Sequence, residues 1–141
     1  MNCLNMSLLA IGLSFGLIAC QVPTSKAKGE SHHYTVKQKC PALLVMESGE
    51  TLEFNAPENP TTGYRWQIMQ PLKLFKTEEL YVATEVEEGV MGSGGEKKIK
   101  FTAEKPGQEL IQLAYVRPWE VDQNISKPNA NQTWQCRIRI S

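Results

Sequence analysis

Short runs in which apolar and polar residues alternate recur along this chain, and they restrict its fold more than any other feature. In Lys97–Ala103, Ile99 and Phe101 fall on one side of an extended strand, and Lys98 and Lys100 fall on the other. No long stretch repeats apolar residues with the 3.6-residue period of a helix. The runs, separated by turns that contain Pro and Gly, predict an all-β, antiparallel β-sandwich of seven to eight strands. The predicted strands cover residues 33–39, 42–46, 51–54, 64–69, 80–86, 97–103, 109–116 and 133–140.

The first 20 residues contain no charged side chain. Met6–Ala19 is apolar but shorter than the roughly 20 residues that cross a bilayer, which is typical of the hydrophobic region of a secretory signal. Leu17–Cys20 resembles the bacterial lipoprotein signal, in which cleavage leaves Cys20 as a lipidated first residue. Met1–Asn5 departs from that signal because it lacks Lys and Arg, so an uncleaved N-terminal anchor is the alternative. Gln21 is not the Asp associated with inner-membrane retention, and the resemblance therefore implies an outer-membrane lipoprotein that faces the periplasm or the cell surface.

The whole chain divides into three parts. Residues 1–19 form the predicted signal peptide, residues 20–33 the lipidated start and a flexible tether, and residues 34–141 one folded domain. All 15 basic and 15 acidic side chains follow the signal, so their balance gives no attraction for nucleic acid or anionic lipid. The two histidines, His32 and His33, stand side by side at the edge of the tether. We interpret them as exposed and unliganded, and no metal or cofactor is predicted.

Four cysteines are present, and the predicted processing leaves two of them for the domain. Cys3 is removed with the signal, and Cys20 takes the lipid. Cys40 and Cys136, near the two ends of the domain, are then predicted to form a disulfide in an oxidising compartment. The competing interpretation is a nucleophilic cysteine, which would require a histidine brought close by the fold, because none is near in the sequence.

The stretch Asn59–Trp66 predicts a rigid loop that leads into a buried strand. Pro60 fixes its own φ and favours an extended conformation at the residue before it. Gly63 can adopt the positive φ of a tight turn, and the β-branched Thr61 and Thr62 form a small, uncharged tip. An ordinary hairpin connection is the alternative. A stiff loop with a small polar tip and an aromatic residue behind it favours a presented binding loop.

Two further loops have unusual compositions. Four glycines fall within Gly89–Gly95, a segment that can approach a partner closely and donate main-chain hydrogen bonds. A phosphate-binding loop is a weak alternative, because neither a helix nor a Lys-Ser/Thr pair follows. The sequence Arg117-Pro118-Trp119 opens a long irregular segment that ends at Gln132. The Trp fits a core plug and an exposed anchor equally, although Trp and Arg are the residues most enriched at interface hot spots.

In this order, Asn-Pro-Thr-Thr-Gly-Tyr, Gly-x-Gly-Gly and Arg-Pro-Trp resemble the loop motifs of the chagasin-type inhibitors of cysteine proteases. The resemblance covers residues 34–141 and implies an immunoglobulin-like β-sandwich. It also implies a reversible, competitive inhibitor, not an enzyme, that inserts three loops into the active-site cleft of a papain-like (cathepsin-type) protease. The loop residues carried over are Asn59, Pro60, Thr61, Thr62, Gly63, Tyr64, Met91, Gly92, Ser93, Gly94, Gly95, Arg117, Pro118 and Trp119.

The resemblance implies a role for each loop. Thr61 and Thr62 would lie over the catalytic cysteine of the protease. Residues 92–95 would follow the non-primed side of the cleft, with Met91 as a filler for an apolar subsite. Residues 117–119 would occupy the primed side. The predicted disulfide is not part of the family pattern and does not alter the loops.

Other classes of protein fit less well. The single aspartate, Asp122, and two adjacent histidines do not assemble a catalytic triad or a metal site, so an enzyme is not predicted. The alternative is an envelope-anchored β-sandwich adhesin or structural lipoprotein without protease binding, which composition permits and only the three loops argue against. We expect a monomer whose partner is a papain-family cysteine protease. It would contact the membrane only through its N-terminal lipid and bind no nucleic acid.

Overall fold

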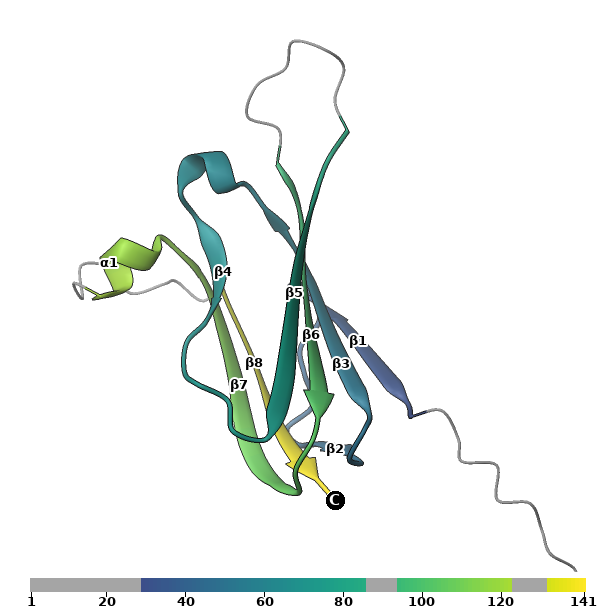
Figure 1. The fold of residues 1–141 in the computed structure, drawn as a ribbon. Coiled ribbons are helices and arrows are strands. Elements are labelled where there is room, and N and C mark those ends of the chain that lie inside the picture. Colours follow the sequence, from purple (N-terminus) through teal and green to yellow (C-terminus); the bar gives the residue numbers. More distant parts are fainter. Residues whose placement is uncertain (1–28, 86–93, 123–131) are drawn as a thin grey trace, which may run out of the picture.

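The computed structural model describes residues 29–85, 94–122 and 132–141. Within them, two four-stranded sheets pack face to face (Figure 1). The predicted signal peptide, Cys20 and residues 91–93 lie outside the described residues. No helix of the described part is long and apolar enough to cross a membrane. The elements are β1 (Ser31–Thr35), β2 (Leu44–Met46), β3 (Thr51–Glu58), η1 (Pro60–Thr62), β4 (Arg65–Ile68), β5 (Phe75–Ala83), β6 (Gly95–Ala103), β7 (Gly107–Val116), α1 (Pro118–Asp122) and β8 (Thr133–Ile140).

One sheet has the strand order β1-β3-β6-β5, and the other has the order β2-β8-β7-β4. The predicted β-sandwich is confirmed. The expectation of purely antiparallel sheets is wrong at two edges, where β1 runs parallel to β3 and β2 runs parallel to β8. The cause is the connection through residues 36–43, which passes from one sheet to the other, so that β1 and β2 cannot form a hairpin.

Side chains from the two inner faces fill the space between the sheets. The alternation predicted for residues 97–103 is confirmed, because Ile99 and Phe101 are completely buried. Aromatic rings meet at the centre, where the Phe54 ring lies 5.2 Å from Trp66 and 5.0 Å from Trp134. Phe54 belongs to one sheet and both tryptophans belong to the other. These ring contacts therefore help to fix how the sheets lie against each other.

β5 begins earlier than predicted, at Phe75 instead of Leu80, and ends at Ala83. It forms a free edge of its sheet, and residues 76–80 are all exposed. An exposed edge strand does not need an apolar side chain at every second position. The first half of β5 therefore lacks the alternation of apolar and polar residues from which strands were predicted.

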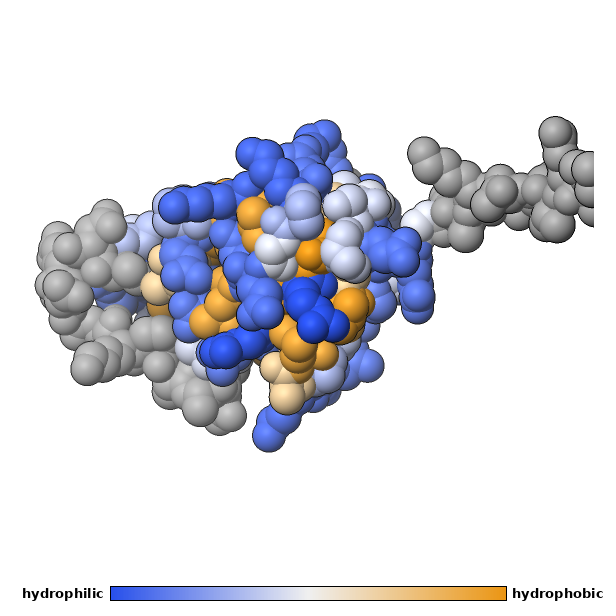
Figure 2. Space-filling view, turned by 90° about the horizontal axis from the view of Figure 1, so that it is seen from below, coloured by the Kyte–Doolittle hydropathy of each residue, from blue (hydrophilic) through white to orange (hydrophobic). Residues whose placement is uncertain are grey.

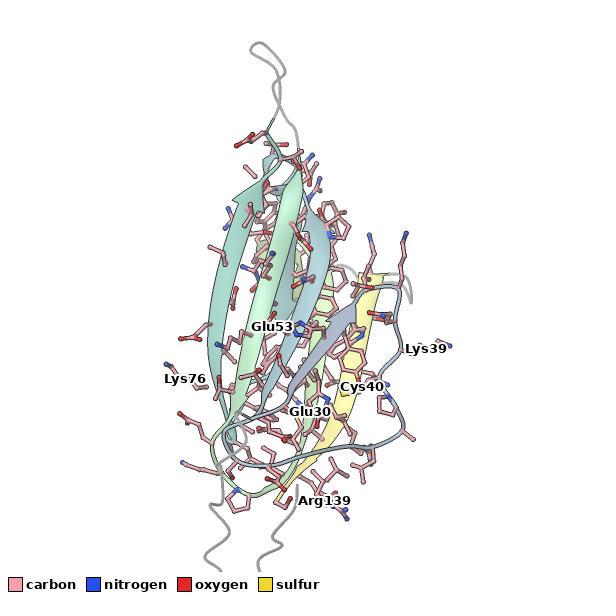
Figure 3. All side chains as sticks on the ribbon, turned by 90° about the vertical axis from the view of Figure 1, so that its right-hand side faces the viewer. Glu30, Lys39, Cys40, Glu53, Lys76 and Arg139 are labelled. Atoms are coloured by element: carbon pink, nitrogen blue, oxygen red, sulfur yellow. A yellow bond between two sulfur atoms is a disulfide. The ribbon has the colours of Figure 1, made fainter. Side chains whose placement is uncertain are left out.

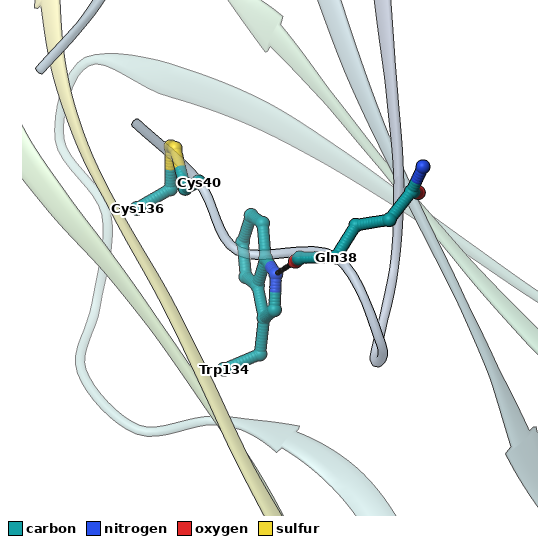
Figure 4. Close-up of a disulfide and its surroundings, with 4 residues drawn as sticks. All are labelled: Gln38, Cys40, Trp134 and Cys136. Atoms are coloured by element: carbon teal, nitrogen blue, oxygen red, sulfur yellow. Dashed lines mark hydrogen bonds between the residues drawn. A yellow bond between two sulfur atoms is a disulfide. The ribbon is translucent and has the colours of Figure 1, made fainter. Parts of the chain in front are cut away.

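The predicted disulfide between Cys40 and Cys136 is present, with Cα atoms 5.2 Å apart. Beside it, Trp134 Nε1 donates a hydrogen bond to the carbonyl oxygen of Gln38 at 2.9 Å (Figure 4). The Tyr34 ring lies 5.6 Å from the Trp134 ring. Together these contacts hold residues 36–43 against β8 and close this edge of the sandwich.

The histidines lie in the first strand and not in the predicted tether, because β1 starts at Ser31. The His32 side chain is only 18% exposed, with Nε2 3.6 Å from Glu50 Oε2, so its predicted exposure is wrong. His33 is exposed as predicted, and its Nδ1 lies 3.2 Å from Glu53 Oε2. Across the described ranges, no group of three or more His, Cys, Asp or Glu residues could hold a metal ion.

Candidate functional site

Three connections lie at one end of the sandwich, opposite the end at which β1 begins (Figure 1). They join β3 to β4, β5 to β6 and β7 to β8. We call them the first loop (residues 59–64), the second loop (residues 84–94) and the third loop (residues 117–132). The first and third loops are neighbours, because Arg65 at the start of β4 pairs with Val116 at the end of β7.

The first loop is a single turn of 3-10 helix, η1, that is held by its own hydrogen bonds. Asn59 Oδ1 accepts from the Thr61 backbone N–H at 3.2 Å and from the Thr61 hydroxyl at 2.6 Å. The Thr62 hydroxyl donates to the Asn59 carbonyl oxygen at 2.7 Å. Gly63 has a φ of 81° and closes the turn by donating to the Pro60 carbonyl oxygen at 3.0 Å. The predicted turn is present, and its exposed tip is uncharged, with both threonine hydroxyl groups hydrogen-bonded.

Two residues that sequence analysis missed fix the base of the first loop. Glu58 is 5% exposed, and its Oε2 accepts a hydrogen bond from the Trp66 backbone N–H at 2.7 Å. The Tyr115 hydroxyl accepts from the Asn59 backbone N–H at 3.1 Å. Trp66 Nε1 donates to the Pro57 carbonyl oxygen at 3.1 Å. The sequence pattern could have identified Glu58, because it continues the alternate residues of β3 that face the core. A carboxylate at such a position needs a buried hydrogen-bond donor.

The third loop begins with the five-residue helix α1 and not with the irregular chain that was predicted. Pro118 opens this helix, a position at which its missing N–H has no consequence. Trp119 is 54% exposed, so it is not a core plug. Its ring still lies against the first loop, because a Cβ added at Gly63 would come within 2.5 Å of Trp119 Cη2. Glycine is therefore favoured at position 63 by its positive φ, and a larger residue there would also displace the Trp119 ring.

Arg117 also joins the third loop to the first. Its Nε donates to the Thr62 carbonyl oxygen at 3.2 Å, and its guanidinium carbon lies 4.6 Å from the centre of the Tyr64 ring. Its Nη1 lies 3.2 Å from Glu120 Oε1. The Tyr64 ring, in turn, lies 5.5 Å from the Tyr115 ring at the base of the first loop. The charge of Arg117 is thus used in contacts within the protein, and the two loops form one surface.

The second loop approaches the first loop through its glycines. A Cβ added at Gly94 would lie 3.2 Å from the Glu58 carbonyl oxygen and 3.6 Å from Asn59 Cβ. A Cβ added at Gly95 would come within 2.6 Å of the Tyr81 hydroxyl oxygen. The two glycines therefore permit β6 to start in close contact with its neighbours and beside the first loop. The predicted tip of the second loop lies outside the described part of the chain.

The structure brings together every predicted loop residue that it describes. The first loop contacts the third through Gly63 and Arg117, and it contacts the second through Gly94. Thr61, Thr62 and Trp119 are the exposed, uncharged residues at the tips of the first and third loops. The described parts of the three loops therefore form one connected surface at one end of the sandwich, with an uncharged tip at the first loop and charged residues such as Glu85 and Arg117 around it.

The chain belongs to the chagasin family of peptidase inhibitors, because the profile of "Chagasin family peptidase inhibitor I42" matches residues 45–138. Amoebiasin-1 from Entamoeba histolytica is 36% identical over 98 residues, which cover 69% of this chain and 88% of amoebiasin-1. Chagasin from Trypanosoma cruzi is 30% identical over 93 residues, which cover 62% of this chain and 83% of chagasin.

Solved structures agree with this assignment. The crystal structure of the cysteine protease inhibitor EhICP2 from Entamoeba histolytica matches with a TM-score of 0.64 and 26% identity, over 79% of this chain and 96% of that chain. The solution structure of amebosin matches with a TM-score of 0.57 and 31% identity, over 78% and 98% of the two chains. The resemblance seen in the three loop motifs is confirmed. The chain is an inhibitor and not an enzyme, and an adhesin or purely structural lipoprotein is not favoured.

Proposed function

We propose that this protein inhibits papain-family cysteine proteases reversibly and competitively, by inserting its three loops into the active-site cleft. The observation that carries the proposal is the direct contact among the loops. Trp119 and Arg117 tie the third loop to the first, and Gly94 places the second loop beside it. A surface that is already rigid loses little conformational entropy when it enters a cleft, which favours affinity.

Each loop then has its own position in the cleft. Thr61 and Thr62 lie over the catalytic cysteine, where their small neutral tip fits without a desolvated charge. Residues 92–95 follow the non-primed side, with Met91 in an apolar subsite. Residues 117–119 occupy the primed side, where the half-exposed Trp119 ring supplies apolar contact area.

The turn of the first loop explains how an inhibitor can occupy the cleft and remain intact. The Asn59 carbonyl oxygen accepts from Thr62 N–H at 3.2 Å, and the Pro60 carbonyl oxygen accepts from Gly63. The Thr62 carbonyl oxygen accepts from Arg117. These hydrogen bonds keep the loop folded back on itself, so it does not offer an extended peptide whose carbonyl carbon the cysteine could attack.

Titration of papain tests the proposal, with a small fluorogenic peptide as substrate and the chain lacking residues 1–20 as inhibitor. We expect tight inhibition that a higher substrate concentration relieves, and an inhibitor that stays uncleaved in the mixture. The control is a variant in which residues 59–63, 92–95 and 117–119 are replaced by Gly and Ser, which should not inhibit. Full papain activity at micromolar concentrations of the unaltered protein would contradict the proposal.

We further propose that the chain is exported, cleaved before Cys20, lipidated there and held in the outer membrane. Two observations support this. A disulfide between Cys40 and Cys136 suits an oxidising compartment, and β1 starts at the end opposite the loops, so an N-terminal anchor would leave the loops free. Mass spectrometry of the mature N-terminus, with Cys20→Ser as the control, would detect the lipid. If the Cys20→Ser variant is found in the membrane fraction to the same extent as the unaltered chain, the N-terminus is an uncleaved anchor.

A further inference from the structure

We propose that the outer face of the β1-β3-β6-β5 sheet, directly below the loops, is a second contact surface for the same protease. This surface consists of Pro57, Leu80 and Val82, and we call it the shoulder. The inference rests on the proposed inhibitory function and extends it, because the shoulder lies on the side of the sandwich and would contact the protease outside its cleft.

The strand register places the shoulder residues side by side. Glu96 of β6 pairs with Pro57 of β3 on one side and with Val82 of β5 on the other. In the next row toward the opposite end, Lys98 of β6 pairs with Leu80. Cross-strand partners on one face lie about 5 Å apart, so the two rows form one continuous patch.

The shoulder leaves two large apolar side chains exposed to water next to each other on one face of β5. Leu80 is 58% exposed and Val82 is 46% exposed. The neighbouring strand β6 places two exposed charged residues, Glu96 and Lys98, beside them, and the charged groups of these two residues lie 4.0 Å apart and offset each other. The shoulder therefore combines exposed apolar side chains with an adjacent ion pair, so it has no net charge and no preference for an anionic or cationic ligand.

The same sheet face changes its character toward the opposite end. There Glu78 Oε1 lies 3.2 Å from Lys76 Nζ, and Glu78 Oε2 lies 3.9 Å from Lys100 Nζ. Figure 3 shows Lys76 on the part of the sheet that is far from the loops. Charged side chains on an edge strand hinder pairing with another chain. Apolar exposure on this face is thus confined to the half next to the loops.

The distance from the shoulder to the loops is short on the scale of a protein. Thr84 opens the second loop, and Val82 and Leu80 stand two and four residues before it on the same strand. At about 3.3 Å per residue, they lie roughly 7 and 13 Å from the loop. On this proposal, the protease surface beside the cleft contacts the shoulder when the loop tips are inside the cleft.

The size of a stable interface also requires contacts beyond the loop tips. A standard protein–protein interface uses about 20–30 residues on each side, more than the three loop motifs supply. Below the first loop, the other sheet offers the polar residues Arg65 and Gln67 of β4. On the sheet that carries β5, Leu80 and Val82 supply exposed apolar area next to the loops, through which the interface can continue.

A double substitution tests the inference in the full chain. Leu80→Ser with Val82→Ser should raise the inhibition constant for papain roughly tenfold, through faster dissociation, because two partly exposed apolar side chains no longer become buried. The matched control is Val45→Ser at the opposite end, since Val45 is 47% exposed and Val82 is 46% exposed. This control should stay within about twofold of the unaltered protein. A second variant, Val82→Lys, places a charge in the shoulder and should also weaken inhibition, while thermal unfolding of each variant reports that it is folded.

The outcomes separate the inference from the function on which it rests. Failure of the unaltered chain to inhibit papain would overturn both. Unaltered inhibition by the folded double variant, with tight inhibition by the parent chain, would overturn the shoulder alone. Sedimentation would reveal a third outcome: a dimer that the double variant abolishes would assign the shoulder to a second copy of this chain, against the inference.

Discussion

The loop end and the disulfide edge both connect the two sheets, but they use different interactions. At the edge, the Cys40–Cys136 bond and the Trp134–Gln38 hydrogen bond hold residues 36–43 to β8. At the loop end, separate hydrogen bonds and ring contacts join one loop to the next. A covalent link between residues 96 positions apart restricts the whole unfolded chain, whereas one hydrogen bond contributes only about 1 kcal/mol.

This difference separates stability from binding within one small domain. Substitutions at the loop tips should change inhibition without unfolding the protein, and substitutions at the disulfide edge should do the reverse. The end of the sandwich away from the loops presents apolar side chains interspersed with hydrophilic ones (Figure 2). The half-exposed Trp119 and the connected loops lie at the other end of the sandwich.

Charge at the tip of the first loop should have the largest effect on inhibition. Thr62→Glu should raise the inhibition constant for papain by a hundredfold or more, because an unpaired buried carboxylate costs roughly 3–5 kcal/mol. The thermal midpoint should change little, since Thr62 is exposed. Thr62→Gln introduces a side chain of the same size as Glu but without its charge, and it should lose less inhibition than Thr62→Glu. Equal losses in the two variants would show that bulk or the lost hydrogen bond of the Thr62 hydroxyl, and not charge, disturbs the fit.

Removal of the disulfide should have the opposite signature. Cys40→Ser with Cys136→Ser should lower the free energy of unfolding by about 2–5 kcal/mol, measured by denaturant titration. At a temperature at which the variant is folded, its inhibition constant should equal that of the unaltered protein. Reduction of the unaltered protein with a dithiol should give the same loss of stability. Weaker inhibition by the folded variant would show that the disulfide edge contributes to binding as well as to stability.

The sequence predicted the inner strands well and the connections less well, for physical reasons. β6 and β8 each bury one face, so their alternation revealed both their position and their inward residues. The parallel edges depend on a crossing between sheets, which no local pattern encodes. Helix α1 has only five residues, too few for a 3.6-residue period, although Pro118 at its first position was a usable signal.

The candidate site shows the same division. Pro60 and Gly63 have restricted or special backbone conformations, so the turn of the first loop could be predicted from residue type alone. The contacts between loops could not, because they join residues distant in sequence, as Arg117 and Thr62 illustrate. Glu58 was missed because a carboxylate in an inward-facing position contradicts the pattern that identifies a core.

The ring of the third loop should have the next largest effect. Trp119→Ala should raise the inhibition constant roughly thirtyfold, or about 2 kcal/mol, as expected for a truncated aromatic hot spot. Trp119→Phe keeps a ring beside Gly63 and should retain most of the inhibition. Both variants should unfold close to the normal temperature, since the ring is 54% exposed. An inhibition constant for Trp119→Ala that matches the parent would remove the ring from the binding surface.

Glu58 is the residue at which the separation between stability and binding should fail. It is buried like the core, yet its carboxylate holds the Trp66 N–H at the base of the first loop. Glu58→Leu leaves that N–H without an acceptor and should lower the free energy of unfolding by about 1–2 kcal/mol. It should also weaken inhibition about fivefold, or roughly 1 kcal/mol, because the first loop loses a fixed base. Glu58→Gln keeps an acceptor oxygen and should recover much of both losses. If Glu58→Leu loses stability but inhibits normally, the carboxylate serves the core alone and the loop is rigid without it.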